Sequence, residues 1–219
     1  MGSMIDYTRP DGAKTRGYLA NAGKGKPGVV VIQEWWGLNP QICGVADRFA
    51  AAGYNALAPD LYEGKVTTER DEAGHLMGKL DFPRATKQDI RGAAQYLAGT
   101  SGKVAVMGFC MGGALTIATA VHVPEFAAGV CFYGIPPASF ADPGRIKIPL
   151  QCHFANQDDW CTPASVDELE KSMRAGAVPF ELYRYDAMHG FFNETSPAYN
   201  KACAEQSWQR TMSFLAAKL

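Results

Sequence analysis

Apolar residues along the chain gather in short continuous runs, and these runs alternate with longer segments in which apolar residues recur every three or four positions. Residues 29–32 form a continuous β-branched run, which is typical of a strand buried on both faces of a mostly parallel sheet. Residues 84–97 carry apolar side chains at Ile90, Ala93, Ala94 and Leu97, which is the stripe of an amphipathic helix. Strand-like and helix-like segments therefore follow one another in turn.

The pattern predicts eight strands, of which the first two flank the turn signal Pro10-Asp11-Gly12 and form an N-terminal antiparallel hairpin. The strands are expected at residues 5–8, 15–20, 29–32, 55–58, 104–107, 129–133, 150–154 and 180–185. Helices are expected at residues 41–52, 66–80, 84–97, 114–121, 164–174 and 199–215. This order indicates a three-layer α/β fold with a mainly parallel eight-stranded sheet, in a single domain over residues 4–219. Ligands of such sheets bind beyond the carboxyl ends of the strands.

Composition narrows the class of protein further. A chain of 219 residues with 47% hydrophobic and 20% charged residues can bury a core without disulfides or metal. Its net charge of −1 lacks the basic excess of nucleic-acid binders, and no apolar run is long enough for a membrane span. Six cysteines have neither paired nor zinc-site spacing. We therefore expect a cytoplasmic, reduced, monomeric protein without metal, nucleic-acid or membrane partners, with Met1 to Ser3 added ahead of a native Met4.

A candidate nucleophile follows the fifth predicted strand, in Gly108-Phe109-Cys110-Met111-Gly112. This is the nucleophile elbow G-x-S-x-G with sulfur in place of the serine oxygen. The glycines on either side remove side chains that would collide with the neighbouring strand and helix, and the start of the following helix favours a thiolate. A glycine-rich turn with a packing cysteine is the alternative.

Of the four histidines, only His189 follows a strand at the carboxyl edge of the predicted sheet. His75 lies in a polar segment, His122 follows a helix, and His153 lies within a strand, where a structural role is expected. A histidine base needs an acid to orient it. Asp158 and Asp159 follow the seventh strand and are both candidates, although either could simply satisfy a turn. The order nucleophile, acid, histidine is that of α/β-hydrolases.

The sequence resembles the dienelactone hydrolase family of α/β-hydrolases over almost its whole length. The resemblance rests on Gln33-Glu34-Trp35-Trp36-Gly37-Leu38, Ala58-Pro59-Asp60-Leu61-Tyr62, Gly108-Phe109-Cys110-Met111-Gly112-Gly113, Gln157-Asp158 and His189-Gly190-Phe191. It implies an α/β-hydrolase fold with a Cys110–His189–Asp158 triad. It also implies that Glu34 lies near Cys110 and influences its protonation, because a carboxylate beside a thiolate raises the pKa of the thiol. The backbone N–H groups of Met111 and Trp35 would form the oxyanion hole.

The resemblance to the family is less complete at the residues expected to contact substrate. Arg70 aligns with an arginine that holds the substrate carboxylate in the family, but Asn193 stands where a second arginine is expected, so dienelactone itself is a doubtful substrate. Trp36, Tyr133 and Phe191 lie at strand ends and could line an aromatic pocket, together with Trp35 and Phe192, or could simply pack under the loops.

These residues predict a hydrolase of small carboxylic esters or lactones that needs no cofactor. Only residues 135–148 separate the sixth and seventh strands, so no large lid is expected and the cleft should suit small substrates. The alternatives are a non-catalytic protein that binds small molecules and a redox sensor that uses Cys110 as a peroxide-sensitive thiol.

Overall fold

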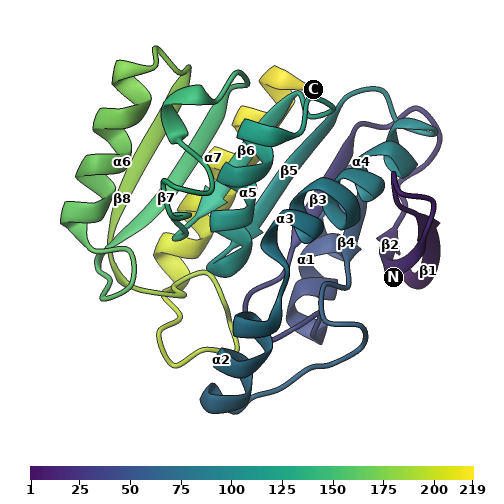
Figure 1. The fold of residues 1–219 in the computed structure, drawn as a ribbon, viewed down its shortest axis with the longest axis horizontal. Helices are drawn as coiled ribbons and strands as arrows, with labels where there is room; N and C mark the ends of the chain where they lie inside the picture. The colour runs from purple at the N-terminus through teal and green to yellow at the C-terminus, as the bar shows by residue number, and fades with distance from the viewer.

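The computed structural model describes all 219 residues and is built around an eight-stranded sheet, with helices on both faces (Figure 1). The strands are β1 (Ser3–Thr8), β2 (Lys14–Ala20), β3 (Gly28–Ile32), β4 (Asn55–Pro59), β5 (Val104–Phe109), β6 (Ala128–Phe132), β7 (Leu150–Gln157) and β8 (Phe180–Met188). Their order across the sheet is β1-β2-β4-β3-β5-β6-β7-β8. The β1–β2 and β2–β4 pairs are antiparallel and all other pairs are parallel, which confirms the predicted fold and N-terminal hairpin.

The central strands are continuous apolar runs because helices cover them on both sides. Every residue of β3, β5 and β6 is buried. The helices are α1 (Pro40–Ala51), α2 (Arg70–Lys79), α3 (Phe82–Arg84), α4 (Arg91–Ala98), α5 (Met111–His122), α6 (Pro163–Ala175) and α7 (Lys201–Lys218), with a π-helical segment at Ala85–Ile90 and a 3₁₀ turn at Pro143–Arg145. Helices α1 and α7 lie behind the sheet in Figure 1, and α4, α5 and α6 lie in front of it. None of the helices is both long and apolar enough to span a bilayer.

Two predicted helices differ from the structure. The helix expected at residues 66–80 begins only at Arg70. The helix expected at residues 84–97 is divided into α3, the π-helical segment and α4. The hydroxyl of Tyr7, from β1, donates to the carbonyl oxygen of Asp89 at 2.9 Å within the π-helical segment. This contact joins residues far apart in the chain, so the apolar stripe alone could not predict the irregular turn.

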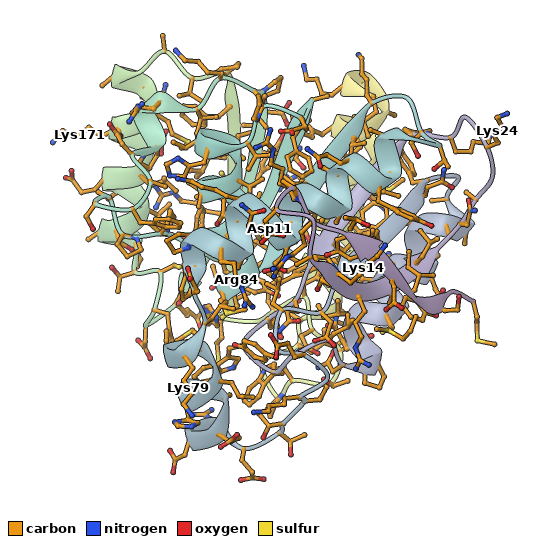
Figure 2. All side chains as sticks on the ribbon, turned by 45° about the vertical axis from the view of Figure 1, so that its right-hand side comes forward. Asp11, Lys14, Lys24, Lys79, Arg84 and Lys171 are labelled. Carbon is orange, nitrogen blue, oxygen red and sulfur yellow. The ribbon has the colours of Figure 1, made fainter.

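The carboxyl ends of the parallel strands meet at the lower edge of the sheet in Figure 1, near α2 and the loop that follows β8. Only a loop and the 3₁₀ turn connect β6 to β7, so no helical cap covers this edge from there, as predicted. Figure 2 shows Lys24, Lys79 and Lys171 directed outward from separate parts of the surface. The edge at the strand ends is therefore the place where the candidate residues are brought together.

Candidate active site

Cys110 lies between β5 and α5 in a strained backbone conformation, with φ 55° and ψ −117°. Two glycines make this turn possible. A Cβ atom on Gly108 would lie 2.1 Å from the carbonyl oxygen of Gly112, and one on Gly112 would lie 2.5 Å from the carbonyl oxygens of Ile32 and Gln33. Helix α5 begins at Met111, three residues earlier than the sequence predicts, so its first N–H groups lie directly after the cysteine. The turn has the geometry of a nucleophile elbow.

Asp158 and His189 follow β7 and β8 and contact each other across the edge of the sheet. The Nδ1 atom of His189 lies 2.8 Å from Oδ2 of Asp158. The other carboxylate oxygen, Oδ1, accepts from the backbone N–H groups of Trp160 at 2.8 Å and Cys161 at 2.9 Å. Burial would raise the pKa of Asp158, but the hydrogen bonds from His189 and from these N–H groups outweigh it and lower the pKa. Asp158 is therefore a fixed, charged partner for the imidazole, and neighbouring Asp159 is exposed.

The imidazole of His189 is placed to exchange a proton with Cys110. Both residues line the same cavity, and Nε2 of His189 is buried without a hydrogen-bond partner of good geometry. Burial alone would lower the pKa of His189, but the negative charges of Asp158 and of the Cys110 thiolate raise it to about 10. The imidazolium is therefore stabilised once the thiol has given up its proton. Hydrogen bonds between catalytic groups often shorten only when substrate binds. The absence of a well-formed hydrogen bond between the sulfur and the imidazole is therefore compatible with proton transfer.

Glu34 opposes ionisation of the thiol. Burial is the main influence on Cys110 and raises the pKa of its thiol. His189 and the N–H of Met111 lower this pKa, whereas the carboxylate of Glu34 raises it. The net shift is upward, so the resting cysteine is protonated. Removing the charge of Glu34 would favour the thiolate.

Two neutral side chains hold Glu34, which is only 4% exposed. The hydroxyl of Tyr133 donates to Oε1 at 3.2 Å, and Nδ2 of Asn193 donates to Oε2 at 2.7 Å. Burial raises the pKa of Glu34, although both hydrogen bonds and the nearby His189 act in the opposite direction. The Oδ1 atom of Asn193 accepts from the backbone and hydroxyl of Thr195. Asn193 is thus committed to the protein itself and does not present a free charged clamp.

The backbone N–H groups of Trp35 and Met111 are the two predicted oxyanion donors. Trp35 lies in the loop that follows β3, and Met111 is the first residue of α5. Neither N–H is bonded to a backbone carbonyl in the loops and turns. The N–H of Met111 is directed at the sulfur of Cys110, whose pKa it lowers. In a nucleophile elbow, the N–H after the nucleophile and an N–H from the loop after the third strand are the donors expected to form an oxyanion hole.

A cavity of about 370 Å³ opens beside these groups. Its lining residues are Glu34, Trp35, Trp36, Arg70, Cys110, Gln157, Asp159, Trp160, Met188, His189, Gly190, Asn193, Ser196, Pro197 and Ala198. Of the expected substrate contacts, Trp36 and Arg70 therefore reach the cavity. Arg70 lies at the first turn of α2 and forms no ion pair, which leaves its charge free for a ligand.

The placement of Tyr133 and Phe191 corrects the prediction that they contact substrate. Both side chains are fully buried and neither lines the cavity. Tyr133 has a positive φ of 37° and directs its hydroxyl to Glu34, and its ring packs against Phe191 with centroids 5.4 Å apart. They support the site from the core. Phe192 is likewise buried and stacks on Phe109.

Sequence reasoning missed several lining residues, of which Trp160 and Met188 are exposed large apolar side chains. Both stand directly beside predicted site residues, next to Asp159 and His189, and this adjacency was the available signal. The loop residues Ser196, Pro197 and Ala198 carried no such signal. His153 is buried between Tyr185 and Gln151 and has the structural role that was expected. No group of three or more His, Cys, Asp or Glu residues is arranged to hold a metal ion.

A mainly parallel sheet, a strained elbow after β5 and an acid–histidine pair after β7 and β8 define an enzyme of the α/β-hydrolase class. The family model of the dienelactone hydrolase family matches residues 15–219. The chain therefore belongs to the dienelactone hydrolase family, as its motifs suggested, and the predicted class of ester hydrolase is confirmed.

Relatives cover nearly the whole chain. The protein usf of Aquifex pyrophilus is 34% identical over 98% of this chain and 97% of its own length. A protein of Saccharolobus solfataricus named as a candidate carboxymethylenebutenolidase is 32% identical over 94% of this chain and 95% of its own. Among solved structures, a protein from Klebsiella pneumoniae described as a candidate dienelactone hydrolase superposes with a TM-score of 0.86, at 24% identity and 99% coverage of both chains. This likeness confirms the fold.

Proposed function

We propose that this hydrolase opens small lactones or cleaves small carboxylic esters with a Cys110–His189–Asp158 triad. The observation that carries the proposal is the strained Cys110 elbow, which shares one cavity with a His189–Asp158 pair joined at 2.8 Å. A strained φ at a nucleophile is maintained only when the surrounding fold fixes it, and such strain is concentrated at active sites. The carboxymethylenebutenolidase name of the Saccharolobus relative is consistent with lactone opening.

The proposed reaction proceeds through a thioester. His189 accepts the proton of the Cys110 thiol, and the sulfur attacks the carbonyl carbon of the ester. The N–H groups of Trp35 and Met111 stabilise the negative charge that develops on the carbonyl oxygen. The carbon–oxygen bond then breaks, and the leaving oxygen takes the proton from His189. Water, deprotonated by His189, then attacks the thioester carbon. The carbon–sulfur bond breaks and releases the acid, and His189 returns the proton to the sulfur.

Glu34 controls when this nucleophile forms. Burial raises the pKa of the Cys110 thiol, and the buried carboxylate of Glu34 raises it further, so the thiol stays protonated while the cavity is empty. Substrate that displaces or protonates Glu34 removes this repulsion and favours the thiolate. This arrangement limits unwanted reactions of the cysteine, because the thiolate is the reactive species.

The raised pKa also favours a hydrolase over the redox-sensing alternative. Sensor cysteines are accessible thiols with a lowered pKa. Cys110 has a raised pKa, and three of the other five cysteines, Cys131, Cys152 and Cys161, are buried.

The substrate is a small molecule, and a carboxylate on it would suit the unpaired charge of Arg70. Asn193 offers no second charge, because it is hydrogen-bonded to Glu34 and Thr195. The proposal is therefore for small esters and lactones held by one cation at most, and does not include dienelactone as the natural substrate.

Hydrolysis of p-nitrophenyl acetate tests the proposal. Cys110→Ala and His189→Ala are expected to lose nearly all turnover, since each removes a participant in thioester formation. Cys203→Ala, which removes a partly buried cysteine on α7, is the matched control and should retain wild-type turnover. Wild-type activity in either triad variant would refute the mechanism.

A further inference from the structure

Trp160 exposes a large apolar surface at the mouth of the cavity. Its side chain is 60% exposed, although tryptophan is among the residues that gain most from burial. The backbone of Trp160 is nevertheless fixed, because its main-chain N–H donates to Oδ1 of Asp158 at 2.8 Å. Its ring also meets that of Trp35 edge to face, with centroids 5.2 Å apart, and Trp35 meets Trp36 in the same way at 5.0 Å. The three indoles form a row along one wall of the cavity.

This row borders the side of His189 that faces the cavity. Tyr133 covers the imidazole from the core, with centroids 5.0 Å apart and rings inclined at 62°. Trp160 flanks it from outside, with centroids 6.2 Å apart and rings inclined at only 31°. Met188, which precedes His189, is 55% exposed and also lines the cavity. Two large apolar side chains, Trp160 and Met188, therefore lie near the imidazole in a cavity that polar residues also line.

The position of an ester in the cavity follows from its chemistry. His189 must reach the leaving oxygen to protonate it, whereas the carbonyl oxygen must point to the N–H groups of Trp35 and Met111. The group attached to the leaving oxygen then lies beyond the imidazole, beside Trp160 and Met188. Aromatic rings pack favourably with indoles and with methionine sulfur.

We infer that Trp160, with Trp35 and Met188, forms a subsite for an aromatic ring on the leaving-group side, so that the preferred substrates are esters of aromatic alcohols. This inference rests on the proposed function, because it uses His189 as the acid that protonates the leaving oxygen. It assigns Trp160 a role in specificity and none in the chemical step.

Benzyl acetate and methyl acetate test the inference, because they share an acyl group and differ in the leaving alcohol. The measured quantity is kcat/KM for benzyl acetate divided by kcat/KM for methyl acetate. We expect Trp160→Ala to lower this ratio by about 5- to 30-fold relative to wild type, because the variant loses one aromatic contact and the burial that accompanies it. The intrinsic reactivity of each ester cancels in this comparison. Trp160→Phe keeps a ring and should retain most of the preference. Tyr96→Ala removes an exposed aromatic ring on α4 and should not change the ratio.

The outcomes separate the two proposals. If Cys110→Ala abolishes turnover but Trp160→Ala leaves the ratio unchanged, the triad stands and the aromatic subsite is refuted. If the wild-type protein hydrolyses neither these two esters nor p-nitrophenyl acetate, the proposed function fails, and ligand-observed NMR of benzyl alcohol then tests the subsite without turnover. Weaker binding of benzyl alcohol to Trp160→Ala than to wild type would support the subsite, and equal binding would overturn it.

Discussion

The reactivity of Cys110 results from opposing influences at the scale of single residues. The imidazole of His189 favours the thiolate, while burial and the carboxylate of Glu34 favour the thiol. Glu34 is itself fixed by Tyr133 and Asn193, so its charge lies at a constant position relative to the sulfur. The ionisation of the nucleophile therefore responds to the charge of one buried carboxyl group, in addition to the burial of the sulfur itself.

Glu34→Gln should make Cys110 more reactive toward iodoacetamide. The amide keeps the shape of the side chain but removes the charge that raises the pKa of the thiol. We expect alkylation near neutral pH to be several-fold faster than in wild type, with the rise in rate displaced to lower pH. Asp159→Asn removes another carboxylate that lines the cavity and is the matched control. An unchanged or slower rate in Glu34→Gln would show that Glu34 does not restrain the thiol.

At the scale of elements, the sharp turn from β5 to α5 depends on close backbone contacts that only glycine permits. Gly112 lies against the carbonyl oxygens of Ile32 and Gln33 at the end of β3. These contacts join the nucleophile elbow to the strand that leads to Glu34 and Trp35. Backbone contacts thus fix the elbow that carries Cys110 relative to the loop that carries Glu34 and Trp35. Backbone atoms cannot move aside by changing rotamer, as a side chain can.

Gly112→Ala should destabilise the protein by roughly 2–4 kcal/mol, because the added methyl group would press against two backbone carbonyls. Urea unfolding measures this change. Gly78→Ala is the control, because Gly78 is an exposed position of α2 with nothing within 4 Å of the added Cβ. It should be neutral or more stable by up to about 1 kcal/mol. Equal stability of the two variants would contradict the close packing described for the elbow.

Much of this arrangement could be predicted from the sequence, because its signals are local. β-Branched runs predict the buried strands, the paired glycines predict the elbow, and His189 is the one histidine directly after a strand at the correct edge. Contacts between distant residues could not be predicted. Asn193 and Glu34 lie 159 positions apart, and nothing near Asn193 indicates that it binds a carboxylate.

Orientation at strand ends was also beyond prediction. Tyr133 follows β6 directly, in a position from which a ring could enter the cavity, but its positive φ turns the ring into the core. Trp160 also lies in a loop after a strand, yet its ring is exposed, and the hydrogen bond from its backbone N–H to Asp158 fixes the backbone there. The sequence places both residues at the same edge, and only backbone conformation and hydrogen bonds decide which one meets the substrate.

At the scale of the whole molecule, the sheet carries a site that lowers stability locally. The strained backbone of Cys110 and the buried carboxyl group of Glu34 both cost free energy, and the surrounding packed core compensates for them. Large buried clusters of apolar residues pack against the sheet and supply this compensation. Stability and function are therefore expected to conflict at Glu34.

Glu34→Gln should accordingly stabilise the fold in a pH-dependent way. Folding raises the pKa of Glu34, so the folded protein binds this proton more tightly than the unfolded chain does. The carboxyl group then costs stability as pH rises through its folded pKa and costs none at low pH. We expect the variant to have a higher Tm than wild type at pH 8 and a similar Tm at pH 4, with about 2–4 °C for each kcal/mol gained. Exposed Glu72→Gln is the control, and a lower Tm of Glu34→Gln at pH 8 would contradict the account.

The covalent intermediate provides the most direct test of the central claim. The wild-type protein would be mixed with p-nitrophenyl acetate, quenched in acid during turnover, digested and analysed by mass spectrometry. The account predicts one acetyl group, attached as a thioester to the peptide that contains Cys110, and no such adduct in Cys110→Ala. Turnover with the acetyl group on another residue, or undiminished turnover in Cys110→Ala, would contradict it.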